Sequence, residues 1–441
     1  MRLPSATTLV GIEVEENFNW WRSIVGADGC MYGIPFNGPR VAKFNPIDKT
    51  LTPIGPDLGD VRGRWARGGV LANNGCMYCL PLDESAQILK LDTIHSTTTV
   101  LDVQLPDPNM IMRWISGALA FDGCIYFMPF NAHRILKLDP NKDSVCCVGD
   151  NFGGAICKHT GTVADSDGYV YGIPFYSQPI IRFDHVSHTT SVIGAFEDTH
   201  GGNNGGGVCG RDGCIYSFNC KHFKVLKMDA VNKSYSLVGN DDDFVDFFVG
   251  DKTFNWGDAV LGNDGCIHWP PLNSHRTLKL DIETQKTSLI GDYFGISGWF
   301  SGAVASDGAI YCLPPVAGKV LRIDPFQEFA TKLKADMKEH PEVLGFLFQT
   351  NKFDKTLYES AIIKYGKAKV FQVIEGCIPT GIEWEGIKTE AFMVAASCKN
   401  SNVDVIYHLL RRDLDQSPLA NWSTTKHLSS RKRQCKKVSG R

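Results

Sequence analysis

Long apolar runs are missing from this sequence, and so is an excess of charge of either sign. No apolar segment approaches the ~18 residues that a membrane-spanning helix requires. The 45 Lys and Arg nearly balance the 48 Asp and Glu, and the net charge of −3 excludes a strongly basic nucleic-acid binder. The start, MRLPSATTLVGIEVEE, has no apolar core of signal-peptide length. We therefore expect a cytoplasmic monomer without a membrane partner.

The common signatures of catalytic sites are also missing. Neither a G-x-S-x-G nucleophile elbow nor an H-E-x-x-H zinc motif occurs. The C-x-x-C pair of Cys76 and Cys79 has no second pair at zinc-site spacing. Residues three apart on a strand also point to opposite faces, which makes this pair a poor chelate. We expect no catalytic residue, no metal and no cofactor.

A disulfide framework is not expected, although the chain has 15 cysteines. The number is odd and no secretory leader is seen, whereas disulfide scaffolds belong to oxidising compartments. One repeated position holds five of them, where we expect small apolar core residues: Cys30, Cys76, Cys124, Cys214 and Cys266.

Hairpin signals, in contrast, are abundant and regular. Asp-Gly or Asn-Gly pairs recur every 43 to 52 residues, ending at Gly29, Gly75, Gly123, Gly168, Gly213, Gly265 and Gly308. Such a pair between apolar runs predicts a tight hairpin, because its turn needs a positive φ. Further strand-like segments, such as ILKLD and SVIG, follow each turn. Four short strands per ~46 residues, repeated seven times, predict a seven-bladed β-propeller over residues 1–325.

Three other positions recur with the turns and support this register. Six residues before each glycine stands a small residue, as the crowding of seven first strands around one axis requires. Three residues after it stands a large ring, expected to pack between blades: Tyr32, Tyr78, Tyr126, Tyr171, Tyr216, His268 and Tyr311. A cation recurs on the third strand, and we expect it to snorkel and pair with an acid of a neighbouring strand: Lys43, Lys90, Lys137, Arg182, Lys227, Lys279 and Arg322.

The last repeat lacks its fourth strand, and the N-terminus contains a replacement for it. The segment TLVG at 8–11 matches SLIG at 288–291, a fourth strand of the preceding repeat. We predict that the N-terminal strand completes the seventh blade, which closes the ring and protects the edges of that sheet.

The repeat DGCIYxxPxN…RxLKLDP resembles the repeats of kelch-like β-propeller proteins over residues 7–325. The resemblance implies a protein-interaction platform more often than an enzyme. Our leading hypothesis is a non-enzymatic interaction or scaffold module that binds an unidentified protein partner through one propeller face. The alternative is a propeller-type lyase or hydrolase with a polar site over the central channel.

The segment after Asp324 changes to helical periodicity. Asp324 and Pro325 predict an N-cap and a first helical residue, and helices are expected within residues 326–415. A small helical bundle is the expected arrangement, and the alternative is a single ankyrin-type repeat, which residues 389–413 resemble. The tail, 416–441, contains the basic stretch KHLSSRKRQCKKVSGR and is expected to be disordered. Nuclear import, or a contact with nucleic acid, is a further hypothesis for this tail.

The expected partner-binding residues gather where chain segments enter the first strands and connect the second and third strands. In a four-stranded blade these two kinds of loop lie on the same face. Aromatic and basic residues are enriched at interface hot spots, and an anionic partner would suit this set: Trp20, Arg40, Trp114, His133, Arg134, His222, Trp256, His275, Arg276, Trp299 and Lys319. The competing interpretation is that the tryptophans only wedge between blades.

Overall fold

The computed structural model describes residues 6–10, 20–35, 39–59, 64–65, 69–85, 87–165, 167–175, 179–195, 206–220, 222–239, 255–294, 298–314, 319–339, 357–365, 369–370 and 372–374. The chain divides into two compact units, Met1–Glu328 and Phe329–Arg441. Every strand that the structure describes belongs to the first unit.

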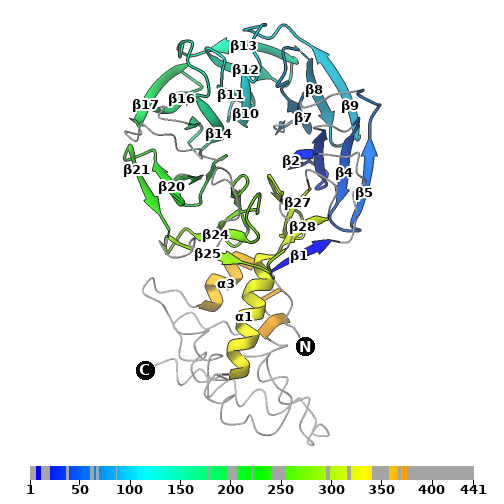
Figure 1. Ribbon diagram of the computed structural model, residues 1–441, viewed down its shortest axis with the longest axis vertical. Coiled ribbons are helices and arrows are strands. Elements are labelled where there is room, and N and C mark those ends of the chain that lie inside the picture. Colours follow the sequence, from blue (N-terminus) through cyan, green and yellow to red (C-terminus); the bar gives the residue numbers. More distant parts are fainter. Residues whose placement is uncertain are drawn as a thin grey trace, which may run out of the picture. The chain divides into compact units, whose positions relative to one another are not determined.

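The first unit is a ring of seven four-stranded antiparallel sheets, the blades of a β-propeller (Figure 1). Blade 1 contains β2 (Trp20–Val25), β3 (Met31–Pro35), β4 (Val41–Asn45) and β5 (Thr50–Ile54). Blade 2 contains β6 (Val70–Leu71), β7 (Cys76–Cys79), β8 (Gln87–Asp92) and β9 (Thr97–Asp102). Blade 3 contains β10 (Trp114–Leu119), β11 (Ile125–Pro129), β12 (Ile135–Asp139) and β13 (Ser144–Val148). The predicted fold is therefore confirmed in its blade count and its strand order.

The remaining blades repeat this plan. Blade 4 contains β14 (His159–Ala164), β15 (Val170–Pro174), β16 (Pro179–Asp184) and β17 (Thr189–Ala195). Blade 5 contains β18 (Val208–Cys209), β19 (Ile215–Asn219), β20 (Lys224–Asp229) and β21 (Ser234–Val238). Blade 6 contains β22 (Val260–Leu261), β23 (Ile267–Trp269), β24 (Thr277–Asp281) and β25 (Lys286–Ile290). Blade 7 contains β26 (Ala303–Val304), β27 (Ile310–Cys312), β28 (Val320–Ile323) and β1 (Thr7–Val10).

The ring is closed by the N-terminal strand, as predicted. β1 pairs antiparallel with β28, with Thr7 opposite Ile323 and Val10 opposite Val320. The Thr7 side chain is buried, and its hydroxyl accepts a hydrogen bond from the backbone N–H of Asp292 in the neighbouring blade at 3.1 Å. The first and last strands of the propeller therefore share one sheet.

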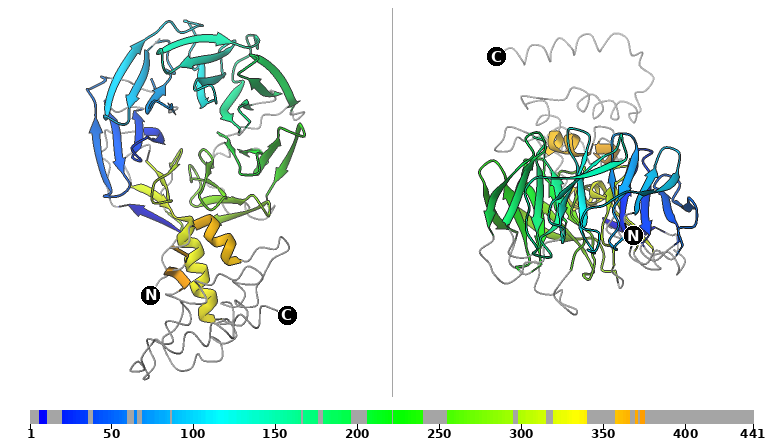
Figure 2. Two further views of the ribbon diagram at one scale, coloured as in Figure 1. Left: turned by 180° about the vertical axis from the view of Figure 1, so that it is seen from behind. Right: turned by 90° about the horizontal axis from the view of Figure 1, so that it is seen from above.

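The strands run between two faces of the ring, as the edge-on view in Figure 2 shows. The hairpins joining first to second and third to fourth strands lie on one face, which we call the turn face. The loops leading into the first strands and those joining second to third strands lie on the other, the loop face. Both follow from the antiparallel order of each sheet.

The predicted hairpin glycines adopt the backbone conformation that the turn requires. Gly123, for example, has φ of 77°, a region that L-residues with a Cβ rarely occupy. The preceding Asp122 accepts a hydrogen bond from the Cys124 N–H at 3.0 Å, which fixes the turn from its other side.

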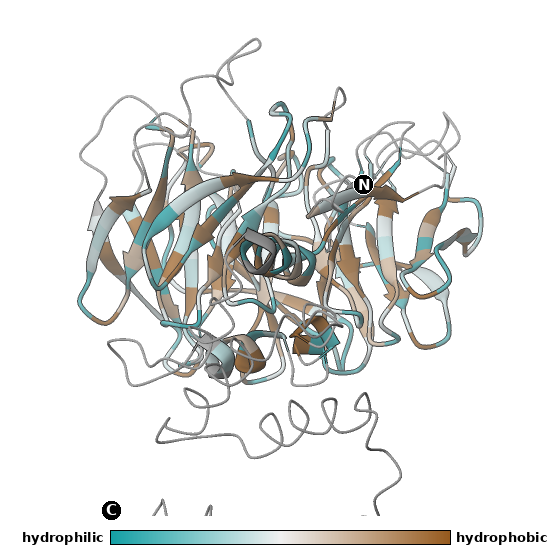
Figure 3. Cartoon of the chain, turned by 90° about the horizontal axis from the view of Figure 1, so that it is seen from below, coloured by the Kyte–Doolittle hydropathy of each residue, from teal (hydrophilic) through white to brown (hydrophobic). Residues whose placement is uncertain are grey.

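The core lies between blades, and second strands such as β3, β11, β15 and β19 are buried along their whole length. Hydrophobic stretches follow many of the strands in Figure 3. The six tyrosines of the repeated ring position are at most 1% exposed. Near the axis, a Cβ added to Gly117 would lie 2.5 Å from the Phe127 ring, which explains why that repeated position is small. Every cysteine that the structure describes has a free thiol, and four of the five repeated ones are buried.

Two helices are described after the last blade: α1 (Pro325–Glu339) and α3 (Leu357–Tyr365). Asp324 caps α1, because its carboxylate accepts hydrogen bonds from the N–H groups of Phe326 and Gln327 at 3.1 Å. This confirms the predicted start of α1. The ankyrin-like segment, 389–413, and the basic tail lie outside the described residues. No helix within the described ranges is long and apolar enough to cross a membrane.

Candidate partner-binding site

A polar triad on the turn face recurs around the ring and accounts for most of the repeated cations. In blade 3, Asp122 accepts hydrogen bonds from the Tyr126 hydroxyl at 2.8 Å and from the Lys137 ammonium at 3.1 Å. Partial burial pushes the pKa of Asp122 upward, but the bonds from Tyr126, Cys124 and Lys137 outweigh it and keep that pKa below its ordinary value. The Asp–Lys pairing predicted from the sequence is confirmed in this blade, and the cation is structural.

The triad survives even where one member is replaced. Blade 2 has Asn74 at the turn position, and Asp143 from blade 3 supplies the missing carboxylate. Asp143 accepts hydrogen bonds from the Tyr78 hydroxyl at 2.7 Å and from Lys90 at 2.6 Å. Blade 6 has His268 in place of tyrosine. The cations of blades 1, 2, 3, 5, 6 and 7 each pair with a carboxylate, but the residue that supplies it can change.

The tryptophans predicted to bind a partner are buried in the structure. Trp20, Trp114, Trp256 and Trp299 are 1–3% exposed. The Trp114 indole N–H donates to the Arg134 carbonyl at 2.8 Å, and Trp256 and Trp299 bond Arg276 and Lys319 in the same way, at 2.9 and 3.1 Å. Each of these three indoles thus ties the start of a first strand to the following second-to-third loop. These side chains support the loop face from beneath and do not contribute to its accessible surface.

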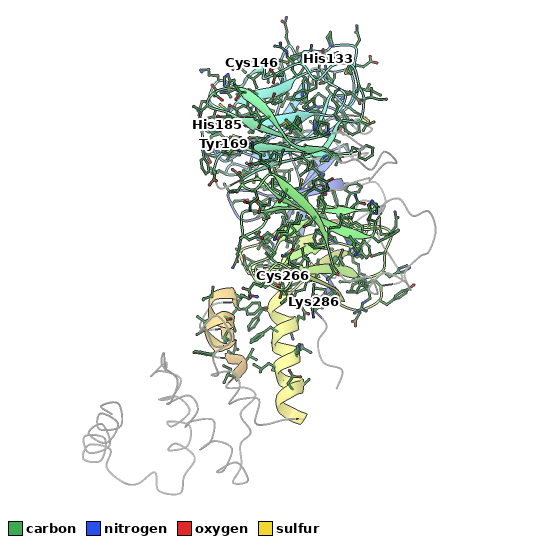
Figure 4. All side chains as sticks on the ribbon, turned by 90° about the vertical axis from the view of Figure 1, so that its left-hand side faces the viewer. His133, Cys146, Tyr169, His185, Cys266 and Lys286 are labelled. Atoms are coloured by element: carbon green, nitrogen blue, oxygen red, sulfur yellow. The ribbon has the colours of Figure 1, made fainter. Side chains whose placement is uncertain are left out.

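The predicted basic residues divide into engaged and exposed groups. The Arg276 guanidinium donates to the carbonyls of Gly291 and Leu289 at 3.0 and 2.8 Å, so it holds an outer strand. The His275 Nδ1 lies 3.1 Å from the Phe294 carbonyl. His133, labelled in Figure 4, places its Nδ1 2.9 Å from Asp107.

Arg40, Arg134 and His222 are exposed, and Lys319 is half-buried. Of the predicted partner-binding residues, these four leave polar surface accessible on the loop face, which is fewer than the sequence suggested.

Two neighbouring loops of this face share a geometry that was not predicted. The loops leading into blades 3 and 4 each present an exposed isoleucine, Ile111 at 53% and Ile156 at 67% exposure. The next residue in each, Met112 or Cys157, has a positive φ of 50° or 56°. Bulky residues adopt that conformation only where their surroundings hold it, and such strain is common at binding sites.

Buried cations hold both loops in place. Arg113 and Lys158 follow the strained residues, and each is 1% exposed. The Arg113 guanidinium donates to the Asp83 carbonyl at 3.2 Å, and the Lys158 ammonium to the carbonyls of Asn131 and Ala132 at 3.2 and 3.0 Å. Burial lowers the pKa of both groups.

One amide links the two loops. The Asn131 side chain donates to the Ile111 carbonyl and accepts from the Cys157 N–H, both at 3.0 Å. Ile111 and Ile156 are therefore held on the same part of the loop face, next to the second-to-third loop that carries Arg134. The matching tetrapeptides IMRW and ICKH, at one register in the two repeats, are the sequence signal that could have found this site.

Comparisons with known proteins identify the fold. No protein-family model matches this chain, and no curated protein matches it. A catalytically inactive virginiamycin B lyase from Staphylococcus aureus, solved with quinupristin, is similar with a TM-score of 0.56. The identity is 10%, over 72% of this chain and 98% of that one.

Other similar structures have different activities or roles. A fungal alcohol oxidase of the AA5 family, in complex with copper, has a TM-score of 0.52 at 12% identity, over 72% of this chain and 76% of the oxidase. The extracellular domain of a putative one-component system from B. thetaiotaomicron has a TM-score of 0.52 at 10% identity, over 70% and 42%. At these identities the likeness shows the propeller fold alone.

Proposed function

We propose that the chain is a non-enzymatic interaction module whose loop face binds an acidic protein segment carrying apolar side chains. The binding surface consists of the exposed side chains of Ile111, Ile156 and Arg134, and we call it the loop surface. The supporting observation is the matched pair of strained, cation-anchored loops that display the two isoleucines. The kelch-like relationship suggested by the repeat belongs to the same proposal.

Rigidity is the physical reason to favour this surface. Loops that are already ordered lose little conformational entropy when a partner binds. The Ile111 and Ile156 side chains gain free energy when a partner removes them from water. Arg134 adds a charge that an acidic residue on the partner can match, which selects orientation and partner.

The test uses the full chain as bait in affinity purification with mass spectrometry. The double variant Ile111→Glu/Ile156→Glu, and separately Arg134→Glu, should reduce recovery of a wild-type partner roughly tenfold or more. Arg276→Glu is not suitable, because it would break the two carbonyl contacts described above. The matched control is Ile94→Glu/Val186→Glu, which changes two isolated apolar residues, 60% and 80% exposed, on the turn face. Equal loss in control and test variants, at unchanged melting temperature, would contradict the proposed site.

A second candidate function, a propeller-type lyase or hydrolase, is favoured by one polar feature near the axis. Arg22 in the first strand of blade 1 and Asp258, just before the first strand of blade 6, form an ion pair of 2.6 Å. The cavity beside Arg22 measures about 30 Å³, which is room for a water molecule but not for an organic substrate. A thermal-shift screen with small metabolites tests this candidate, since a ligand at the pair would stabilise wild type and not Asp258→Asn.

A further inference from the structure

A cavity of about 290 Å³ opens on the turn face between blades 4 and 5. Its wall contains the turn residues of both blades and the third strand of blade 4: Asp165, Asp167, Tyr169, Tyr171, Arg182, Asp212, Asp229 and Val231 among others. The cavity lies on the face opposite the loop surface and is independent of the proposed function.

Blade 4 departs from the repeat at the residues that form this cavity. Tyr169, labelled in Figure 4, stands where five other blades have cysteine. The Arg182 guanidinium lies over the Tyr169 ring, 4.5 Å from the ring centre, and also donates to the Ser191 hydroxyl at 3.3 Å. The Tyr171 hydroxyl donates to Asp165 at 2.7 Å, whereas the other tyrosines with a turn carboxylate use the aspartate directly before the glycine. The normal partner, Asp167, is therefore displaced from the triad.

The charge of the cavity is negative, and one carboxylate remains available. Four aspartates and one arginine line the wall. Asp165, Asp212 and Asp229 already accept several hydrogen bonds from backbone and side-chain donors. The Asp167 carboxylate is exposed, and none of the described residues donates to it or pairs with it.

Another junction of the same ring shows what such a space accepts. Lys49, in the third hairpin of blade 1, inserts its ammonium against the turn residues of blade 7. It contacts the Tyr311 hydroxyl, lies 4.6 Å from the centre of that ring, and stands 4.0 Å from the Asp307 carboxylate. Asp307 and Tyr311 are the blade 7 equivalents of the acid and ring in the blade 4 cavity.

The residue of blade 5 that corresponds to Lys49 does not occupy the cavity. Lys233 has the same left-handed backbone, with φ of 50° against 63° for Lys49. Its side chain is exposed and does not line the cavity. The space that an internal lysine fills between blades 7 and 1 is therefore open between blades 4 and 5.

We infer that the cavity between blades 4 and 5 binds the ammonium of a lysine side chain from a partner protein. Asp167 pairs with the ammonium, the half-buried Tyr169 ring contacts the aliphatic stem, and Asp165 adds negative potential. Val231 is 84% exposed at the rim, where it can pack against an apolar residue beside the lysine. The four carboxylates make an anionic ligand unfavourable.

The test measures binding of a defined probe to the full chain by calorimetry and saturation-transfer NMR. The probe is the capped peptide Ala-Val-Lys-Val-Ala, and its control has norleucine in place of lysine. Wild type should bind the lysine peptide and not the norleucine peptide. Asp167→Asn should weaken binding by up to about fivefold, because an exposed ion pair contributes up to ~1 kcal/mol. Asp102→Asn, the same charge change on an exposed outer strand, should leave binding unaltered.

A second variant protects the test from a folding artefact. Tyr169→Cys restores the residue of most other blades, and it should lower affinity while the melting temperature stays within a few degrees of wild type. Absence of lysine-peptide binding, equal binding of the norleucine peptide, or wild-type affinity in Asp167→Asn would each overturn the inference. Cadaverine binding as tightly as the peptide would assign the site to free amines and overturn the assignment to a protein partner.

Discussion

His159 occupies the position at which blades 1, 3, 6 and 7 have a tryptophan. The ring is 2% exposed, and its Nδ1 lies 3.2 Å from the Pro129 carbonyl. Burial disfavours the charged ring more strongly than the contacts with Pro129 and Pro179 favour it, which lowers the pKa of His159 to about 4. The folded protein therefore holds this histidine neutral at physiological pH.

The low pKa of His159 predicts acid sensitivity. Its contribution to stability is complete above the ordinary histidine pKa of 6.5 and is lost as pH falls toward about 4, because the unfolded chain takes up the proton first. That loss is on the order of 3 kcal/mol. His159→Trp should remove this acid sensitivity, because tryptophan does not titrate. The larger ring should fit, because Gly172 faces His159 as Gly33 faces Trp20 in blade 1. Urea unfolding between pH 7.5 and 4.5 measures the difference. Parallel curves for variant and wild type would show that another group causes the acid sensitivity.

At the scale of elements, the blades are joined by polar contacts that cross from one sheet to the next. The contact between blades 2 and 3 is the clearest. Blade 2 has the uncharged Asn74 at the turn position, and Asp143 of blade 3 supplies the carboxylate that the turn aspartate supplies in blades 1 and 3. Asp143→Asn should destabilise the protein by about 1–2 kcal/mol, since Lys90 and Tyr78 lose their charged acceptor.

A second substitution should reverse that loss. In the Asp143→Asn background, Asn74→Asp restores the carboxylate at the position that blades 1 and 3 use, and the melting temperature should recover. In the wild-type background the same Asn74→Asp change places two carboxylates beside one lysine and should be unfavourable. Thermal unfolding of the four proteins gives the cycle. If the effects of the two substitutions on stability simply add, the carboxylate at position 74 does not replace the one at position 143, and the proposal is contradicted.

The sequence predicted the elements of the ring well, but it did not show which of the proposed partner-binding side chains are exposed. The hairpins depend on Asp-Gly pairs and the core on short apolar strands that recur at one register of the repeat. Both are local signals that survive in a single sequence. The positive φ of Met112 and Cys157 has no such signal, because neither residue type favours it. The tryptophans were ambiguous for another reason. Aromatic residues serve cores and interfaces equally, and only the contact with a carbonyl twenty residues away separates the two roles.

At the scale of the whole molecule, stability should depend on closure of the ring by β1. Deleting residues 1–12 removes the strand paired with β28 and leaves the hydrogen-bonding edge of that strand open. The deletion also removes the Thr7 hydroxyl that accepts the hydrogen bond from the Asp292 N–H, so the junction between blades 6 and 7 weakens as well. The truncated chain should aggregate or melt many degrees lower, and a synthetic peptide of residues 1–12 should restore the melting temperature by occupying the edge. Deleting residues 426–441 is the control, because that basic segment has too few apolar residues to join a core. A chain without residues 1–12 that stays monomeric and melts like wild type would show that closure does not depend on β1.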